Sequence, residues 1–387
     1  MKKLLFVCYG LGIGGIEKCL VNLVNALSEE KFDVDILLMN PEYAMKNHIR
    51  RKVRYLDSFR YVMNTTDTFA EIKKRGGVIK NLGRFISYCL FRLRVKSGSG
   101  YVWKSFKSLP DEYDIAVAYS QNDYSPYYVI DKVSAGRKVM WYHNGAYEKT
   151  GAAYEGDKQY YEKFSYVVAV SDDCANVLNS KFEFNNNQLV VLRNICDVES
   201  ILNKSEEFKP ESYKGEAVHI STVGRLTKEK GCDIAIKTCK LLIDKGYNVI
   251  WHWVGDGNQK DNAYKLICDY NLNGAFVLEG NQDNPYPYIK CSDIYVQPSY
   301  YEAYSTTITE AKVLKKPIVT TDVGGMRDQL TDNYNGIITA VNPKDVSDAV
   351  IRLIDDGQFR NDIIANLGEA KIANNAALDQ YYSTVFS

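Results

Sequence analysis

The sequence predicts an α/β protein of two Rossmann-like domains, each a doubly wound parallel sheet, that face one another across a cleft. The chain has 387 residues, which is enough for two ordinary domains. Short apolar runs alternate with segments of helical periodicity along its length, as strands and crossover helices do in parallel sheets. A polar stretch near the middle, residues 198–215, interrupts this alternation and marks a domain boundary.

The apolar runs give the strands in order. In the first half they are LLFVCY, DILLM, DIAVAY, KVMWYH, YVVAVS and LVVLRN. In the second half they are VHISTVG, VIWHWVG, AFVLEG, DIYVQPS, PIVTTD and NGIITA. The interrupting stretch carries Pro210 and only weak periodicity. We therefore expect domains at residues 1–200 and 201–365, followed by a helical tail, residues 366–387, that can pack back on the first domain.

Composition excludes several classes of protein. Lys and Arg number 48, as do Asp and Glu, so the chain has no overall excess of positive charge of the kind that nucleic-acid binding favours. The nine cysteines are scattered without metal-ligand spacing, which favours a reducing compartment. The first apolar run, Leu4 to Tyr9, ends in glycines and reads as a buried strand rather than a signal peptide. No apolar stretch approaches a membrane span, so we expect a cytoplasmic protein.

The first candidate site is GLGIGG, residues 10–15, between the first strand and the helix IEKCLVNLVNAL. It satisfies G-x-G-x-x-G, and its backbone N–H groups with the helix N-terminus suit a phosphate or diphosphate. A dinucleotide site also needs an acid at the end of the second strand. Asp33 and Asp35 open that strand instead, and Glu42 comes late. Glycines that only permit tight packing of helix on strand remain an equal alternative.

The second domain offers cations and carboxylates at the expected cleft. VGRLTKEKG places Arg225 and Lys230 between a strand and a helix, where a guanidinium and an ammonium group together can bind a diphosphate. Lys228 and Glu229 of the same loop read as solvated. YEAYSTTITEA then places Glu302 and Glu310 around a helix start.

These motifs resemble a family. Three segments of the second half together resemble the C-terminal domain of a retaining glycosyltransferase of family 4 (glycosyl transferases group 1), which has the GT-B fold. They are VGRLTKEKG, WVGDG and NPYPYIKCSDIYVQPSYYEAYSTTITEAKVLKKPIVTTDVGG. YGLGIGGIEKCLVNLVNAL resembles the N-terminal glycine loop and first helix of that family, and WYHNG its His-containing strand end. Each motif is short, but their order and the Glu-x7-Glu spacing make the set specific. The family usually has Gly after the first Glu, where this chain has Ala303 and Tyr304.

The resemblance implies a donor site for a nucleotide sugar in the second domain and an acceptor site in the first. Glu310 would bind the ribose hydroxyls and Glu302 the donor sugar, while Arg225 and Lys230 would neutralise the diphosphate. His143 would meet the donor sugar from the first domain. The remaining donor contacts would come from Gly14 and Gly15 of the first domain, and from Ala303, Tyr304, Ser305 and Thr306. The residues with catalytic roles would be Glu302, His143, Arg225 and Lys230.

Simple geometry agrees with this interpretation of the two carboxylates. Eight helical residues span about 12 Å, whereas the two carboxylates of a glycosidase lie roughly 5 to 9.5 Å apart. Two contacts along one elongated ligand fit better than an acid–base pair. Breaking the anomeric bond builds negative charge on the departing phosphate, which cations and N–H dipoles stabilise, so we expect neither a metal nor another cofactor. Sequence alone leaves front-face attack and a covalent intermediate both open.

The acceptor side is suggested by charge. Between Tyr43 and Pro110 the chain has sixteen Lys or Arg and three Asp or Glu. Within this region, residues 78–96 have the pattern of a basic amphipathic helix, which fits an anionic membrane surface or a solvated helix packed on its own domain. We therefore expect a saccharide acceptor that is lipid-linked, a place at the inner face of the membrane, and no nucleic-acid partner.

The sequence thus predicts a retaining transferase of a hexose-type sugar in bacterial surface polysaccharide biosynthesis, as the resemblance implies. An NAD(P)-dependent oxidoreductase would rest on the glycine loop alone. A sugar-nucleotide epimerase of the same fold would need no second substrate, and a nucleotide-sugar sensor would bind without turnover.

Overall fold

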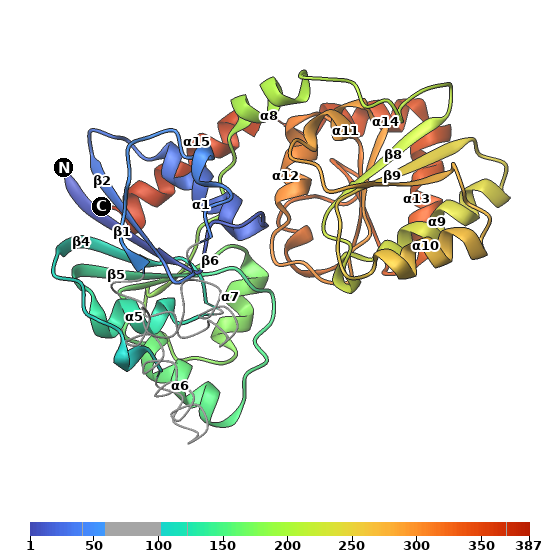
Figure 1. Cartoon of the computed structure of the whole chain (residues 1–387). Helices are drawn as coiled ribbons and strands as arrows, with labels where there is room; N and C mark the ends of the chain where they lie inside the picture. Colours follow the sequence, from blue (N-terminus) through green and yellow to red (C-terminus); the bar gives the residue numbers. More distant parts are fainter. Residues whose placement is uncertain (41, 59–101, 122, 369) are drawn as a thin grey trace, which may run out of the picture.

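The computed structural model describes residues 1–40, 42–58, 102–121, 123–368 and 370–387, and it contains two parallel sheets (Figure 1). The first has the strand order β3-β2-β1-β4-β5-β6-β7. Its strands are β1 (Lys2–Cys8), β2 (Phe32–Leu38), β3 (Arg54–Tyr55), β4 (Glu112–Ala118), β5 (Ser134–Tyr142), β6 (Tyr166–Ala169) and β7 (Leu189–Val191). The second has the order β10-β9-β8-β11-β12-β13. Its strands are β8 (Val218–Val223), β9 (Val249–Val254), β10 (Phe276–Gly280), β11 (Ile294–Gln297), β12 (Ile318–Thr321) and β13 (Ile337–Thr339).

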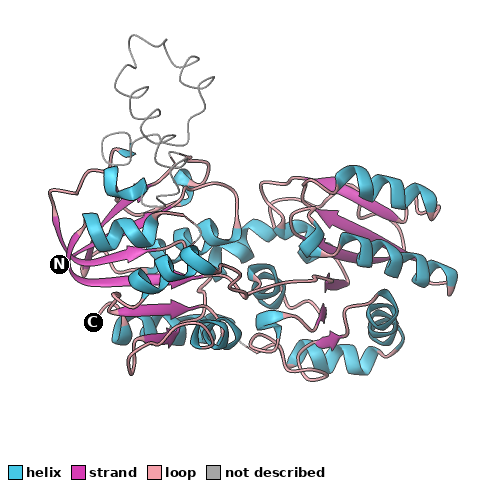
Figure 2. Ribbon diagram, turned by 90° about the horizontal axis from the view of Figure 1, so that it is seen from below, coloured by secondary structure: helices cyan, strands magenta, loops and turns pink. Residues whose placement is uncertain are grey.

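Helices bracket the strands of each domain (Figure 2). The first domain carries α1 (Gly15–Ala26), η1 (Lys46–His48), η2 (Val102–Ser105), α5 (Ser125–Lys132), α6 (Gly151–Tyr161) and α7 (Asp172–Asn179). The second carries η3 (Lys228–Lys230), α9 (Cys232–Asp244), α10 (Lys260–Asp269), α11 (Tyr286–Cys291), α12 (Thr306–Val313), η4 (Gly324–Met326), α13 (Pro343–Asp355) and α14 (Gly357–Ala365). The predicted fold class is therefore confirmed, and all twelve predicted strands are present.

The strands form where the sequence is continuously apolar. Leu4 to Val7 in β1 have no exposed surface, because helices cover both faces of a doubly wound sheet. In both sheets the strand order reverses direction beside the first strand of the domain, at β1/β4 and at β8/β11. Ligands of open α/β sheets bind at such switch points, beyond the carboxyl ends of the strands. The loops after β1, β4, β8 and β11 therefore border the places where ligands are expected.

Two further helices join the domains. α8 (Val198–Ser205) follows the first sheet, and its Ile201 packs with Tyr286 and Val313 of the second domain. α15 (Ala370–Thr384) returns to the first domain (Figure 1). Its Tyr381 is 1% exposed and stacks on Trp141 of β5 at 5.9 Å between ring centroids. The chain therefore ends in the core of the domain in which it begins.

Candidate active site

The loop between β8 and α9 is built around a glycine that brings Lys230 to the end of β11. Gly231 has a φ of +70°, and a Cβ on it would lie 1.9 Å from the carbonyl oxygen of Pro298. Both features require glycine. Arg225, in contrast, is not held in place: its side chain is 69% exposed and forms an ion pair with Glu229 at 3.2 Å. Glu229 thus has a partner, although the sequence suggested a purely solvated residue.

Glu302 is the anchored carboxylate of the second domain. Its Oε1 accepts hydrogen bonds from Lys230 Nζ at 2.6 Å, from Ser299 Oγ at 2.8 Å and from Gln297 Nε2 at 3.2 Å. The residue is only 6% exposed. A buried carboxylate is stable when such donors satisfy it. Lys230 and Glu302, which the sequence placed on different parts of a ligand, form one ion pair here.

The backbone that follows Glu302 is held in several ways. Gly324 has a φ of +45°, and a Cβ there would meet the carbonyl oxygen of Glu302 at 1.7 Å. The Ser305 hydroxyl caps α12 by accepting from the N–H of Ile308 at 3.3 Å. The N–H of Ser305 donates to Gln329 Oε1 at 2.8 Å, so that one of the predicted donor-binding amides already has a partner.

The departure from the family pattern also has a structural role. The side chains of Ala303 and Tyr304 pack against the hydrophobic core of the first domain. Burial is the main cause that raises the pKa of the Tyr304 hydroxyl to about 12. The residues that stand where the family usually has glycine thus contribute to the contact between the two domains.

Glu310 is paired with a residue that sequence reasoning missed. Lys18, on α1 of the first domain, places its Nζ 2.5 Å from Glu310 Oε1 and 4.8 Å from the centre of the Tyr286 ring. Glu310 is 2% exposed, and its Oε2 is buried without a hydrogen-bond partner among the described residues. Each carboxylate of the Glu-x7-Glu pair therefore has its own lysine, one from each domain.

Two helix N-termini face each other near these pairs. A Cβ on Gly15, the first residue of α1, would lie 4.0 Å from Thr306 Oγ1, at the start of α12. Gly14 precedes α1 in an extended conformation, and a Cβ on it would lie 2.3 Å from Glu17 Oε2. Glu17 therefore occupies the N-terminus of α1, where an acidic side chain is favoured.

A second carboxylate lies along the glycine loop. A Cβ on Gly12 would lie 2.9 Å from Glu42 Oε1. Burial is the main cause that raises the pKa of Glu17, and the charge of Glu42 acts in the same direction, whereas Arg225 acts in the opposite one. With two carboxylates beside it, the glycine loop alone is a poor binding site for a diphosphate, and nearby cations become necessary.

Of the three acids considered for a dinucleotide site, Asp33 and Asp35 are unsuited to bind a ribose, whereas Glu42 lies beside the glycine loop. Asp35 is 5% exposed, and it accepts hydrogen bonds from Tyr113 and, in a bidentate pair, from Arg54. Asp33 lies at the start of β2, away from the carboxyl end of the strand where a ribose would bind. The structure therefore does not favour the oxidoreductase alternative.

His143 follows β5 and approaches the Glu302 loop. Burial lowers the pKa of its imidazole to about 4, although the Tyr119 backbone acts in the opposite direction, and its Nε2 has no hydrogen-bond partner among the described residues. The ring is therefore neutral at neutral pH. The next residue, Asn144, accepts a hydrogen bond from the Tyr301 hydroxyl at 2.6 Å. A Cβ on Gly145 would lie 3.0 Å from the carbonyl oxygen of Glu302.

Three sequence predictions concern the basic segment, membrane crossing and metal binding. The basic segment 78–96 lies outside the described residues. Within the described part of the chain, no helix combines the length and apolar character that a membrane crossing needs. The same part has no group of three His, Cys, Asp or Glu side chains that could hold a metal ion.

Residues 203–369, which make up most of the second domain, match the family model described as glycosyl transferases group 1. A poly(ribitol-phosphate) α-N-acetylglucosaminyltransferase of Staphylococcus aureus is 27% identical over 248 residues, which are 62% of this chain and 46% of that protein. The capsular polysaccharide biosynthesis glycosyltransferase CapM of Staphylococcus aureus is 29% identical over 176 residues, 44% of this chain and 45% of CapM. The chain thus spans about half the length of these curated relatives.

Solved structures share the fold along the whole chain. HepE from Anabaena, in complex with UDP and glucose, superposes with a TM-score of 0.72 at 16% identity and covers 100% of both chains. Sucrose-phosphate synthase from Thermosynechococcus elongatus has a TM-score of 0.69 at 15% identity, and covers 100% of this chain and 99% of its own. The two-sheet architecture described above is therefore the GT-B fold.

Proposed function

We propose that this protein is a glycosyltransferase that moves a hexose-type sugar from a nucleotide-diphosphate sugar to a saccharide acceptor, with retention of anomeric configuration. The main support is the arrangement around α12, where the ordered carboxylates Glu302 and Glu310 flank a helix N-terminus that faces the N-terminus of α1. Glu302, Glu310 and α12 lie within the residues that match the family model of glycosyl transferases group 1, which supports the proposal. Two relatives are named for transfer to a poly(ribitol-phosphate) and for capsule biosynthesis, which supports a role in bacterial surface polysaccharide assembly.

The donor's nucleoside is assigned to Glu310. Lys18 donates a hydrogen bond to Oε1 of this carboxylate, while the buried Oε2 still has an accepting lone pair. A ribose hydroxyl is a donor of the right kind. A charge-assisted hydrogen bond of this type contributes about 1.5 to 3 kcal/mol, or roughly ten- to a hundredfold in affinity.

The leaving diphosphate is assigned to Lys230 and Arg225. When the anomeric C–O bond breaks, its electron pair stays on the phosphate oxygen, and fixed cations stabilise that charge. Lys230 is already fixed by Glu302, whereas the exposed Arg225 can leave Glu229 to bind the phosphate. An exposed pair of that kind costs little to break.

Retention by attack on the front face fits these contacts. Glu302 Oε1 is held by three donors, which makes the group a weak nucleophile. The acceptor oxygen would then form the new bond on the side of the departing diphosphate, and its proton would pass to a phosphate oxygen. The neutral His143 imidazole can accept a hydrogen bond from the donor sugar through its unpartnered Nε2.

The acceptor is proposed to be a lipid-linked saccharide at the inner membrane face. This proposal rests on the basic composition of residues 78–96 and on the surface-polysaccharide relatives.

A binding panel tests the donor assignment. Purified protein is melted with UDP, GDP, ADP, their sugar conjugates, NAD and NADP, each with and without EDTA. We expect stabilisation by one sugar nucleotide with EDTA present, by about 2.7 kcal/mol at a hundred times its Kd. Glu310→Ala should reduce this stabilisation to about 0.4 to 1.4 kcal/mol at the same concentration, because a ten- to hundredfold loss of affinity lowers the ratio of ligand to Kd. Stabilisation by NAD or NADP alone would instead support a dinucleotide loop.

A further inference from the structure

A second pocket lies between the domains, away from Arg225, Lys230 and Glu302. It has a volume of about 350 Å³, within the range of sites for small molecules. Three elements line it: the central turns of α1, residues 45–50 after β2, and α8. Tyr286 at the start of α11 completes the wall.

Hydrogen-bond donors and positive charges dominate the lining. Lys18, His48, Arg50 and Lys204 face the pocket, and Asp197 is its only acidic residue. Asp197 already pairs with Arg50 Nη2 at 2.6 Å, and Lys18 pairs with Glu310. The remaining polar side chains are asparagines, a serine and a tyrosine, all of which can donate.

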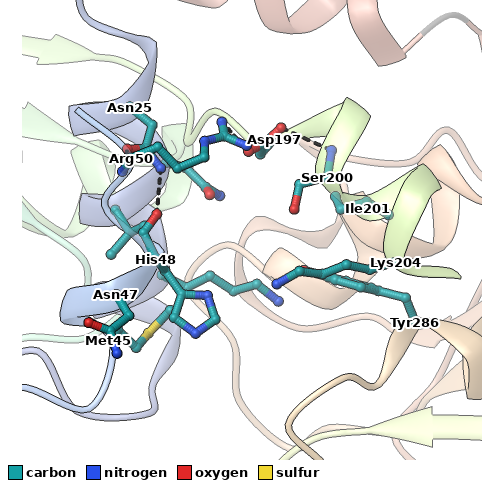
Figure 3. Close-up of a pocket in the computed structure, with 13 residues that line it drawn as sticks. Asn25, Met45, Asn47, His48, Arg50, Asp197, Ser200, Ile201, Lys204 and Tyr286 are labelled. Atoms are coloured by element: carbon teal, nitrogen blue, oxygen red, sulfur yellow. Dashed lines mark hydrogen bonds and ion pairs between the residues drawn. The ribbon is translucent and has the colours of Figure 1, made fainter. Parts of the chain in front are cut away.

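Lys204 is the cation of the pocket lining that has no ion-pair partner among the described residues. Figure 3 shows its side chain reaching from α8 across the pocket toward His48 of the first domain. Among the described residues, none forms an ion pair with its ammonium group. Burial, and then the charges of Lys204 and Lys18, lower the pKa of His48, whereas Asp283 acts weakly in the opposite direction. Lys204 thus lies beside cations that already have acidic partners, without an acidic partner of its own among the described residues.

We propose that this pocket binds a small, water-soluble phosphate ester, held by Lys204, Arg50 and His48. A phosphate group supplies the missing negative charge and several acceptor oxygens for the surrounding donors. Because the lining comes from both domains, the ligand stabilises their present arrangement. The proposed transfer reaction does not use Lys204, Arg50 or His48, although Lys18 belongs both to the pocket wall and to the Glu310 pair.

The test uses the full-length protein with labelled histidine and inorganic phosphate as the probe. The chain has four histidines, so the imidazole resonance of His48 can be assigned with a single His48→Asn variant. We expect phosphate at millimolar concentrations to shift this resonance saturably and to raise the pKa of His48. Lys204→Glu should weaken phosphate binding about tenfold or more, since one charge-assisted hydrogen bond is lost.

Lys209→Glu is the matched control. Lys209 is an exposed residue of the linker after α8, outside the pocket, and its variant carries the same change of charge. Equal weakening by the two variants would overturn the proposal, because the effect would then be general screening. Displacement of phosphate from His48 by UDP would assign the pocket to the nucleotide. Binding of phosphatidylglycerol vesicles through Lys204 without any response to inorganic phosphate would assign it to a lipid surface.

Discussion

Replacing Lys18 with methionine tests the ion pair that joins the two domains. Methionine keeps an unbranched apolar stem beside Tyr286 but removes the charge. The Glu310 carboxylate, 2% exposed, then loses the only donor to Oε1 that the described residues provide, while Oε2 has none. In the part of the chain that the structure describes, Lys18 is the cation that pairs with this buried carboxylate.

The expected loss follows from burial. Removing one partner of a buried ion pair costs about 3 to 5 kcal/mol. Since the Lys18 side chain is 26% exposed, we expect the lower end, about 3 kcal/mol, for Lys18→Met. Burial acts to lower the pKa of Lys18, but Glu310 and Tyr286 raise it more, so that the pKa is raised overall. The contribution is therefore complete below the ordinary lysine pKa of about 10.4 and is lost only as the pH rises further.

The assay is denaturant unfolding at pH 7.5, with Lys18→Met, Glu310→Gln and the double variant forming a cycle. We expect the double variant to be more stable than the sum of the single losses predicts, because the buried charge is removed together with its partner. Lys52→Met, at an exposed lysine of the same domain, should stay within about 0.5 kcal/mol of the wild type. Additive losses, or equal effects of Lys18→Met and Lys52→Met, would refute the coupling.

Three further changes test other parts of the site. The pKa of His143 is about 4 in the folded protein, against an ordinary value of 6.5. The free energy of unfolding should therefore fall by roughly 3 kcal/mol as the pH drops from 6.5 to 4. His143→Gln should flatten this dependence when the protein is melted at a series of pH values. Lys230→Met should lower kcat about a hundredfold or more in a radiolabelled sugar-transfer assay, whereas Lys228→Met in the same loop should not. In chemical unfolding, Gly231→Ala should lower the stability by more than 3 kcal/mol, because its Cβ would lie 1.9 Å from a carbonyl oxygen. The control Gly246→Ala has a similar φ but open space around it, so it should cost about 1 kcal/mol.

The fold could be predicted because its signals are local. An apolar run such as the one in β9 is buried on both faces of a sheet, and the order of strands and helices then limits the topology. The exception is β3, a two-residue edge strand that the sequence did not reveal. So short a segment has no periodicity to detect.

The site was predictable only in part, because sequence patterns report local structure and not contacts between residues that lie far apart in the chain. Local pattern places Glu302 after strand β11, Lys230 after strand β8 and Glu310 inside helix α12. Lys18 lies 292 residues from its partner Glu310, and no local pattern records such a pairing. Its position one turn inside the helix after the glycine loop was the available signal. Sequence reasoning placed Arg225 beside Lys230 as a ligand of the diphosphate, but its side chain is 69% exposed and pairs with Glu229.

The charges around the N-termini of α1 and α12 differ between the two domains. On the first domain, Glu17 occupies the N-terminus of α1 and Glu42 lines the glycine loop, so that this side repels a diphosphate. On the second domain, Lys230 is fixed, and the charge of the exposed Arg225 acts against the burial that raises the pKa of Glu17. Under the proposed function, the negative charge of a donor would therefore be neutralised mainly by the second domain. The first domain would supply contacts to the sugar and hold Glu310 through Lys18, so that donor binding would depend on the contact between the two domains.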